Sequence, residues 1–214
     1  MSATSGRPAL VGLPVNLLLA GRKIVVVGGG RIAARKIADL VNVGALVRVI
    51  ALEIIDAIAL LEREGKVTVA LKSFETQDLD GAWLVLTATG DLDVDAAVHA
   101  EAEARNLFCN SADDPAHCSF TLMSVVRQGD LVVALGTGGR SPAIAKWLKE
   151  ILQQEIGPEY STLLDIFAEA RESLRSLGRS SEDANWRLAL DSGIVDLVKS
   201  GRVDEAKELL NSCL

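Results

Sequence analysis

The stretch that decides the fold of this chain reads Ile24-Val25-Val26-Val27-Gly28-Gly29-Gly30-Arg31-Ile32-Ala33. An apolar, β-branched run typical of a buried strand meets three glycines and passes directly into a helical pattern. Gly28 allows a tight turn, Gly30 lets the backbone come close to a phosphate, and Ala33 is small enough for the helix to pack on its strand. Because the first N–H groups of a helix have no partner inside it, they can bind an anion. The stretch therefore predicts a strand, a loop and a helix that hold the pyrophosphate of a dinucleotide.

The residues after the glycine loop complete a β-α-β unit. Gly44-Ala45 ends the helical pattern, and residues 46–51 form a second β-branched run typical of a parallel sheet. Glu53 follows at about the offset, roughly 20 residues, at which a carboxylate accepts hydrogen bonds from the adenine-side ribose. This role favours NAD over NADP, because a carboxylate repels a 2′-phosphate. Equally, Glu53 can be the first-turn acid of the next helix, where the helix dipole stabilises it.

Strands and helices continue to alternate as far as residue 112. One strand, residues 83–88, ends in Thr87-Ala88-Thr89, and ligands of open α/β sheets bind beside such strand ends. Thr87 and Thr89 are therefore candidate cofactor contacts. The other elements predicted in this part are a short strand over 14–19, a helix over 54–64, a strand over 67–71, a helix over 93–105 and a short strand over 107–109.

The alternation stops after residue 112, which indicates a second architectural unit. Residues 120–126 and 131–135 flank a glycine-containing turn and predict an antiparallel hairpin. Ser141 is placed to cap a helix that starts near Ala143, with proline at its first position. Beyond residue 158, glycines separate helical segments over 160–177, 182–190, 194–199 and 203–210, which predicts a small helical domain.

Residues 119–149 carry a local excess of basic side chains. This excess either holds an anionic ligand or belongs to solvated loops and helix faces. The chain as a whole has a formal net charge of −7, which argues against nonspecific nucleic-acid binding, because such binding depends on phosphate neutralisation. The charged residues of the segment are Arg127, Arg140, Lys146 and Lys149, against Asp130.

Length and composition limit the class of protein. With 214 residues and 49% apolar content, the chain can bury a core and divide into more than one domain. Charged residues interrupt its apolar segments too soon for a membrane span, and no secretion leader is recognisable, so we expect a cytoplasmic protein without a membrane partner. Cys109, Cys118 and Cys213 form no C-x-x-C pair, and with His117 they offer too few ligands at a recognisable spacing. We therefore predict neither a disulfide framework nor a metal site.

Five strings of sequence occur in a fixed order: residues 13–22, then Gly28-Gly29-Gly30-Arg31-Ile32-Ala33-Ala34-Arg35-Lys36, Cys109-Asn110-Ser111-Ala112-Asp113, Ser119-Phe120 and Gly138-Gly139-Arg140-Ser141-Pro142. In this combination the chain resembles the siroheme synthase family from about Leu13 to Leu148, and more weakly through the C-terminal helices. It departs from the family pattern at two places. Met123 stands where a proline is common, and Gly136-Thr137 replaces the commoner Ser-Thr or Ser-Ser pair.

The resemblance implies a homodimer with an N-terminal Rossmann domain and precorrin-2 dehydrogenase activity, in which NAD⁺ oxidises precorrin-2 to sirohydrochlorin. Many members also insert Fe²⁺ into sirohydrochlorin, so Fe²⁺ is implied as a second substrate. The methyltransferase half of the fused relatives is not expected in this chain. An alternative stays open, namely a noncatalytic module that binds NAD and mediates assembly.

Position by position, the resemblance also implies residue roles. Asp113 matches the acid that the family uses for catalysis, and Ser141 falls near the tetrapyrrole. Arg140 and Lys146 are candidate contacts for the carboxylates of the substrate. Arg31 and Ile32 match NAD contacts at the glycine loop, and Leu52 with Glu53 matches those after the second strand. The predicted cofactor site thus comprises Gly28, Gly29, Gly30, Arg31, Ile32, Leu52, Glu53, Thr87 and Thr89.

These observations predict an α/β protein in three parts. Residues 1–112 are expected to form a Rossmann-type parallel-sheet domain that binds NAD. Residues 113–150 are expected to form a small hairpin-containing region for dimerisation and substrate binding. Residues 151–214 are expected to form a helical domain.

Overall fold

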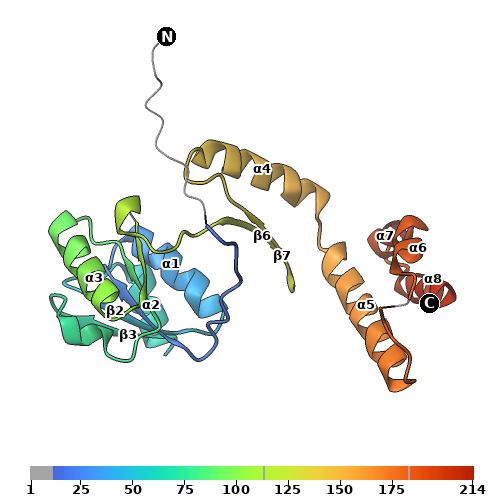
Figure 1. Cartoon of the computed structure of the whole chain (residues 1–214), viewed down its shortest axis with the longest axis horizontal. Coiled ribbons are helices and arrows are strands. Elements are labelled where there is room, and N and C mark those ends of the chain that lie inside the picture. Colours follow the sequence, from blue (N-terminus) through green and yellow to red (C-terminus); the bar gives the residue numbers. More distant parts are fainter. Residues whose placement is uncertain (1–11, 113, 183) are drawn as a thin grey trace, which may run out of the picture. The chain divides into compact units, whose positions relative to one another are not determined.

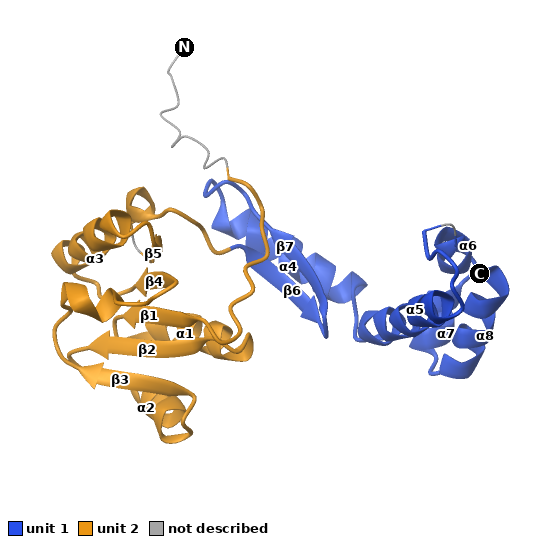
Figure 2. Ribbon diagram, turned by 60° about the horizontal axis from the view of Figure 1, so that its bottom comes forward, with its two compact units in different colours: residues 1–11, 123–214 blue, residues 12–122 orange. Residues whose placement is uncertain are grey.

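The computed structural model describes residues 12–112, 114–182 and 184–214. These residues fall into two compact units, residues 12–122 and residues 123–214, which Figure 2 shows in different colours. The predicted division into three parts stays a prediction.

The first unit is built on a five-stranded parallel sheet with the strand order β3-β2-β1-β4-β5. This order puts β1 at the centre, with the chain crossing over in opposite directions on its two sides, as in a Rossmann fold. The predicted α/β class and the parallel sheet are therefore confirmed. The strands are β1 Lys23–Val27, β2 Leu46–Ala51, β3 Val67–Leu71, β4 Leu84–Thr87 and β5 Phe108–Ser111. The connections contain α1 Arg31–Asn42, α2 Asp56–Arg63 and α3 Leu92–Ala104, with short 3₁₀ turns η1 Thr76–Leu79 and η2 Pro115–His117 (Figure 1).

Both faces of this sheet are covered, which explains the unbroken apolar runs of its strands. Ile24 and Val26 of β1 pack in one core cluster with residues of α1. Val25 and Val27 face the other way and pack in a second cluster with residues of α3. Because β1 is buried on both faces and paired on both edges, the whole unit fixes the position of its carboxyl end.

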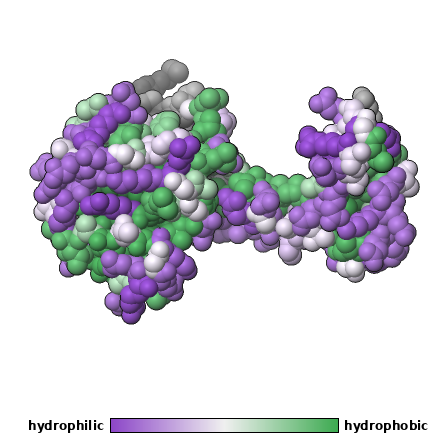
Figure 3. Space-filling model, turned by 90° about the horizontal axis from the view of Figure 1, so that it is seen from below, coloured by the Kyte–Doolittle hydropathy of each residue, from purple (hydrophilic) through white to green (hydrophobic). Residues whose placement is uncertain are grey.

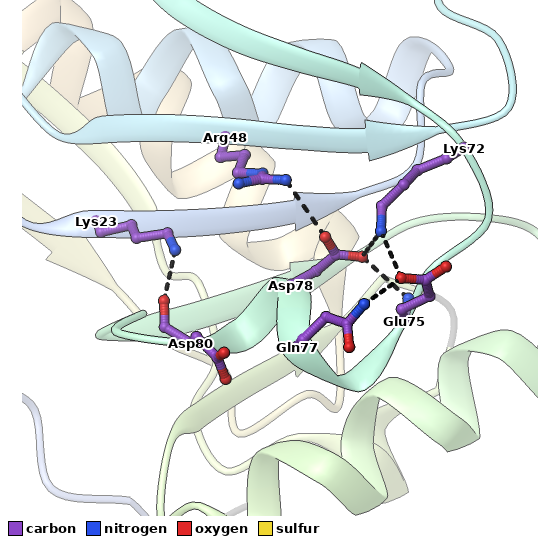
Figure 4. Close-up of polar contacts among 7 residues, drawn as sticks. All are labelled: Lys23, Arg48, Lys72, Glu75, Gln77, Asp78 and Asp80. Carbon is purple, nitrogen blue, oxygen red and sulfur yellow. Dashed lines mark hydrogen bonds and ion pairs between the residues drawn. The ribbon is translucent and has the colours of Figure 1, made fainter.

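A buried carboxylate on η1 binds a side chain of β2 and the side chain of the residue that follows β3 (Figure 4). The Asp78 carboxylate lies 3.0 Å from Nζ of Lys72 and 3.4 Å from Nη2 of Arg48. It also accepts a hydrogen bond of 3.0 Å from the backbone N–H of Glu75, and the Glu75 side chain completes a reciprocal cap of the turn. Buried charges are tolerated where they are paired in this way.

The second unit consists of an antiparallel hairpin followed by helices, as predicted. The hairpin joins β6 Ser124–Gln128 to β7 Leu131–Leu135, and α4 Pro142–Glu155 packs on it. A separate core cluster forms where α5 Glu159–Ser176 meets the three short helices, which are α6 Trp186–Asp191, α7 Ile194–Lys199 and α8 Val203–Cys213. Within the described ranges of both units, no helix is long and apolar enough to cross a membrane.

Two predicted strand segments are wrong. Residues 14–19 form no strand and take no place in the sheet order β3-β2-β1-β4-β5. The segment instead packs Leu19 into the core of the sheet. The first hairpin strand begins only at Ser124 rather than at Phe120, because the Phe120 carbonyl is bonded to the side chain of Asn110.

Candidate dinucleotide and catalytic site

The glycine loop follows β1 at the carboxyl edge of the sheet, and its backbone lies against the end of β4. Gly28 has a φ of +125°, and a Cβ at this position would lie 2.3 Å from the carbonyl oxygen of Ala88. The Gly28 N–H donates to the Ile50 carbonyl at 2.9 Å, and the Ala88 N–H donates to the Val27 carbonyl at 2.9 Å. Only glycine fits this turn, as the sequence predicted.

Gly29 and Gly30 have opposite surroundings. A Cβ on Gly29 would lie 1.9 Å from the carbonyl oxygen of Glu53, and the Gly29 carbonyl accepts a hydrogen bond of 3.0 Å from the N–H of Ile55. The loop after β1 is thus fixed against the loop after β2, a constraint that the glycine fingerprint did not reveal. A Cβ on Gly30 would meet no atom within 4 Å. Protein packing does not require glycine at position 30, so the space beside it is free for a ligand.

The start of α1 fits an anion. Gly30 is the N-cap of the helix and offers no side-chain hydrogen bond to it, so the N–H groups of the first turn are left for another acceptor. A pyrophosphate at this helix end would meet both those N–H groups and the positive end of the helix dipole. The residues present therefore fit a dinucleotide.

The other predicted cofactor residues lie at the same edge of the sheet, where the strand order reverses between β1 and β4. Ligands of open α/β sheets bind at such a reversal. Arg31, Ile32, Leu52 and Glu53 are all exposed, and the side chains of Ile32 and Leu52 have exposed fractions of 43% and 74%. Exposed apolar side chains beside a glycine loop offer contact surface for the flat rings of a dinucleotide.

The structure speaks against one of the two alternatives for Glu53, and its role in ribose binding stays a prediction. Helix α2 begins at Asp56, and Asp56 is the acid of its first turn. Glu53 precedes the N-cap of that helix and is therefore not a first-turn acid. Glu53 is exposed and lies two residues after the end of β2, near the position of the ribose-binding acid in Rossmann folds.

The two threonines at the end of β4 share one partner that the sequence did not reveal. Both Thr87 and Thr89 donate a hydroxyl hydrogen bond to Oδ1 of Asp95 on α3, and the bond from Thr89 measures 2.6 Å. Thr87 and Asp95 are buried, so the Thr87 hydroxyl is directed towards α3. Nothing local in the sequence distinguishes Asp95 from the other first-turn acids of that helix. The contacts of Thr87 and Thr89 with a cofactor stay predictions.

Asp113, the predicted catalytic acid, lies outside the described residues. The segments on either side of it are held together. The Ser119 N–H donates to the Cys109 carbonyl at 2.8 Å, and the Ser119 hydroxyl accepts from the Cys109 N–H at 2.8 Å. Asn110 forms an antiparallel bridge with Cys118 and donates from Nδ2 to the Phe120 carbonyl at 3.0 Å. These bonds explain why Asn110 and Ser119-Phe120 accompany Asp113 in the sequence pattern.

The two histidines of the chain lie on elements beside this loop. The rings of His99 on α3 and His117 on η2 have centroids 4.7 Å apart, and Nδ1 of His117 lies 3.3 Å from Oδ2 of Asp114.

Burial raises the pKa of the nearby Cys109 thiol to about 12, with a smaller contribution from the charge of Cys118. In the ranges that the structure describes, no three His, Cys, Asp or Glu side chains gather in a way that could hold a metal ion.

The three predicted substrate contacts belong to the unit of residues 123–214. The Ser141 hydroxyl accepts a hydrogen bond of 3.2 Å from the N–H of Ile144 and so caps α4, as predicted. Arg140 is exposed, and Nζ of Lys146 lies 3.9 Å from Oε1 of Glu150. Their roles in substrate binding stay predictions.

The two departures from the family pattern lie in contact with each other. A Cβ on Gly136 would lie 2.7 Å from Cε of Met123. The methionine side chain therefore fills the space that a serine Cβ would take at position 136. The two replacements are therefore neighbours within the second unit.

The fold and the glycine loop together define a Rossmann-type nucleotide-binding protein. The family model described as "Putative NAD(P)-binding" matches residues 15–124, and the chain belongs to this family. This match covers the sheet and all of the predicted cofactor residues.

Individual relatives extend the likeness over most of the chain. A siroheme synthase of Methylobacillus flagellatus is 34% identical over 204 residues, and one of Pseudomonas entomophila is 35% identical over 202 residues. Each alignment covers 94% of this chain but only 44% of the relative, so the chain spans less than half of their length. Among solved structures, the chain is similar to "SirC, precorrin-2 dehydrogenase", with a TM-score of 0.76 and 27% identity. That similarity covers 94% of this chain and 98% of SirC.

Proposed function

We propose that this protein is an NAD-dependent precorrin-2 dehydrogenase of siroheme and tetrapyrrole biosynthesis, which converts precorrin-2 into sirohydrochlorin. The observation that carries the proposal is the similarity to SirC, because it extends over nearly the full length of both chains. The siroheme synthases at 34% and 35% identity support the same pathway. The open space at Gly30 and the uncapped start of α1 supply the dinucleotide site that this reaction requires.

The reaction removes two hydrogens from the macrocycle, one as hydride and one as a proton. NAD⁺, when bound, supplies the hydride acceptor. The protein has to align the two reactants and accept the proton. We assign the proton to the carboxylate of Asp113, and the hydrogen bonds of Asn110 and Ser119 hold the segments on either side of that residue.

The proposed cofactor contacts follow from the edge of the sheet. The backbone of Gly28, Gly29 and Gly30, together with the first turn at Arg31, receives the pyrophosphate. Glu53 accepts hydrogen bonds from the adenine-side ribose, which excludes a 2′-phosphate and selects NAD. Ile32 and Leu52 supply apolar contact. On the substrate side, Arg140 and Lys146 provide positive charge for the carboxylates of the tetrapyrrole, with Ser141 beside them.

The experiment follows NADH formation after purified protein is mixed with precorrin-2 and NAD⁺. We expect the wild type to produce NADH and Asp113→Asn to produce none while its Kd for NAD⁺ is unchanged. Asp114→Asn is the matched control, because it removes the adjacent acid and should keep most of the rate. If the wild type binds NAD⁺ but makes no NADH, the dehydrogenase proposal fails and the noncatalytic NAD-responsive module is favoured.

The insertion of Fe²⁺ into sirohydrochlorin, which the resemblance to the siroheme synthase family implies, is a separate reaction with its own test. Fe²⁺ is a substrate there, and the absorbance of sirohydrochlorin with Fe²⁺ is followed with and without the protein. Faster insertion with the wild type assigns a chelatase activity to this chain, whereas equal rates assign it elsewhere. The predicted cytoplasmic location is tested by cell fractionation.

We also propose that the protein is a homodimer that uses α4. Support comes from an unburied apolar stripe, since Ile144, Trp147 and Ile151 follow one helix face and Trp147 is 59% exposed. Figure 3 shows apolar surface along this part of the second unit. We expect Trp147→Glu to convert a dimer to a monomer in sedimentation analysis, whereas Gln153→Glu, which adds the same charge on the other side of α4, leaves the dimer intact. Equal masses for the two variants would exclude α4 as the interface.

A further inference from the structure

Lys36 is the one lysine among the buried residues that the structure describes, with an exposed fraction of 8%. It lies in α1, the helix that begins at the glycine loop. Its Nζ donates a hydrogen bond of 2.5 Å to Oδ1 of Asn110 at the end of β5, 74 residues further along the chain. A buried ammonium group is costly unless its hydrogen bonds are made, so this contact is a strong constraint on both elements.

The lysine decides which way the Asn110 amide points. An ammonium group only donates hydrogen bonds, so the carbonyl oxygen of the amide must face Lys36. The amide NH₂ group is then directed to the Phe120 carbonyl at 3.0 Å and lies 3.5 Å from Sγ of Cys118. A flipped amide would set two donors against each other at Lys36 and two acceptors against each other at Phe120.

The orientation of Asn110 in turn closes the loop that contains the proposed base. Asn110 and Phe120 stand on opposite sides of residues 111–119, and the bond between them holds the two sides together. The Ser111 N–H donates to Sγ of Cys118 at 3.2 Å within the same closure. Lys36 therefore links α1, the helix of the dinucleotide site (labelled in Figure 1), to the hydrogen bond between Asn110 and Phe120 that brackets Asp113 in the sequence.

We propose that Lys36 is a positioning residue for the dehydrogenation. Through Asn110, it holds the loop of the base at a fixed place relative to the helix that receives the dinucleotide. The inference rests on the proposed function for its catalytic consequence, whereas the closure of the loop is tested without any reaction.

The test replaces Lys36 by methionine, which keeps the length and apolar stem of the side chain but removes its donors. The matched control is Lys66→Met at an exposed lysine that pairs with Glu64. In hydrogen exchange of the full chain, we expect the amides of Ser111 and Ser119 to exchange at least about tenfold faster in Lys36→Met, with β1 and β2 unchanged. In kinetics, we expect kcat to fall at least about tenfold while the Kd for NAD⁺ changes less than about threefold.

Asn110→Asp keeps the inference testable if Lys36→Met does not fold. Its carboxylate pairs with Lys36 but cannot donate to the Phe120 carbonyl, so we expect the same fast exchange at Ser119 with α1 unchanged. Lys36→Arg keeps a buried donor and should restore slow exchange. A folded Lys36→Met with wild-type exchange and kcat overturns the inference, and so does a loss of kcat that comes with an equal loss of NAD⁺ affinity. If the wild type makes no NADH, the proposed function fails, but the exchange result still decides whether Lys36 closes the loop.

Discussion

At the scale of single residues, neighbouring glycines carry different constraints. The Gly29 position is closed by the backbone of Glu53, whereas the Gly30 position is open. We expect Gly29→Ala to lower the free energy of unfolding by about 3 kcal/mol, because its Cβ would overlap a backbone atom that cannot move without shifting the loop. Gly30→Ala should cost less than about 1 kcal/mol but raise the Kd for NAD⁺ at least about tenfold, because the new methyl group occupies the approach of the phosphate.

Urea unfolding and NAD⁺ titration of the two variants separate these effects. Each glycine serves as the control for the other, since the substitution is the same and the positions are adjacent. A Gly30→Ala variant that binds NAD⁺ as the wild type does would show that the dinucleotide does not approach this part of the backbone.

Cys109 gives a second prediction at this scale, on pH dependence. Its pKa is raised to about 12 by burial in the folded protein, from 9.0 for a free thiol. Between these values the unfolded chain releases a proton that the folded chain retains, so stability present below pH 9.0 is lost as the pH rises towards 12. We expect unfolding free energies measured at increasing pH to fall more steeply for the wild type than for Cys109→Ala, by up to about 1.4 kcal/mol per pH unit. Parallel curves for the two proteins would contradict the raised pKa.

At the scale of elements, two aspartates of one turn differ in the stability that they provide. Asp78 is buried, and its carboxylate binds Lys72, Arg48 and the backbone of η1. Asp80 is exposed and pairs with Arg105. We expect Asp78→Ala to lower the free energy of unfolding by about 2 kcal/mol, because it removes the acceptor of the turn and the carboxylate that Arg48 and Lys72 share, and leaves Lys72 with Glu75 alone.

Asp80→Ala is the matched control for this prediction and should cost less than about 0.5 kcal/mol, as surface ion pairs usually do. The Asp80 carbonyl still accepts the hydrogen bond of Lys23 in that variant, because the bond uses the backbone. Urea unfolding measures the free energy of unfolding of Asp78→Ala and of Asp80→Ala. Equal losses for the two variants would show that the buried network does not hold β2, β3 and η1 together.

The element boundaries show what local sequence encodes. The predicted strands 67–71 and 131–135 and the helix 194–199 have the bounds found in the structure, because alternating or periodic apolar residues end there at glycines and polar turns. The helix predicted from residue 182 begins instead at Trp186. The Asn185 side chain caps it, and Nε1 of Trp186 donates to the Ser181 carbonyl, two contacts that periodicity alone does not reveal.

At the scale of the whole molecule, the two core clusters of the α/β unit draw only on residues between 17 and 120. We therefore expect a fragment of residues 12–122 to fold cooperatively and to bind NAD⁺ with a Kd within about threefold of the full chain. Circular dichroism on heating and NAD⁺ titration measure this. A fragment that is unfolded, or folded without NAD⁺ affinity, would show that residues 123–214 are needed to complete the nucleotide site.

Some residues of the candidate site were predicted from the sequence, and others were recognised only in the structure. The glycine loop, the strand end at Thr87 and the acid after β2 were predicted from sequence, because each depends on a turn or a strand end formed by neighbouring residues. Asp95 and Lys36 were not assigned a role. Their partners, Thr87 and Asn110, come from other elements, and in a sequence an acid or lysine in a helix is indistinguishable from a solvated one.

The amino-acid sequence by itself determined that this protein has a parallel α/β sheet, a loop open to a dinucleotide, a hairpin and a helical end, because periodicity and turn chemistry act over a few residues. Tertiary structure alone decided that Gly29 lies against Glu53, that residues 14–19 pack Leu19 into the core instead of forming a strand, and that a lysine of the first helix orients an asparagine 74 residues away. These contacts depend on which elements pack together. That choice is made by the burial of the whole core and not by any local stretch of the chain.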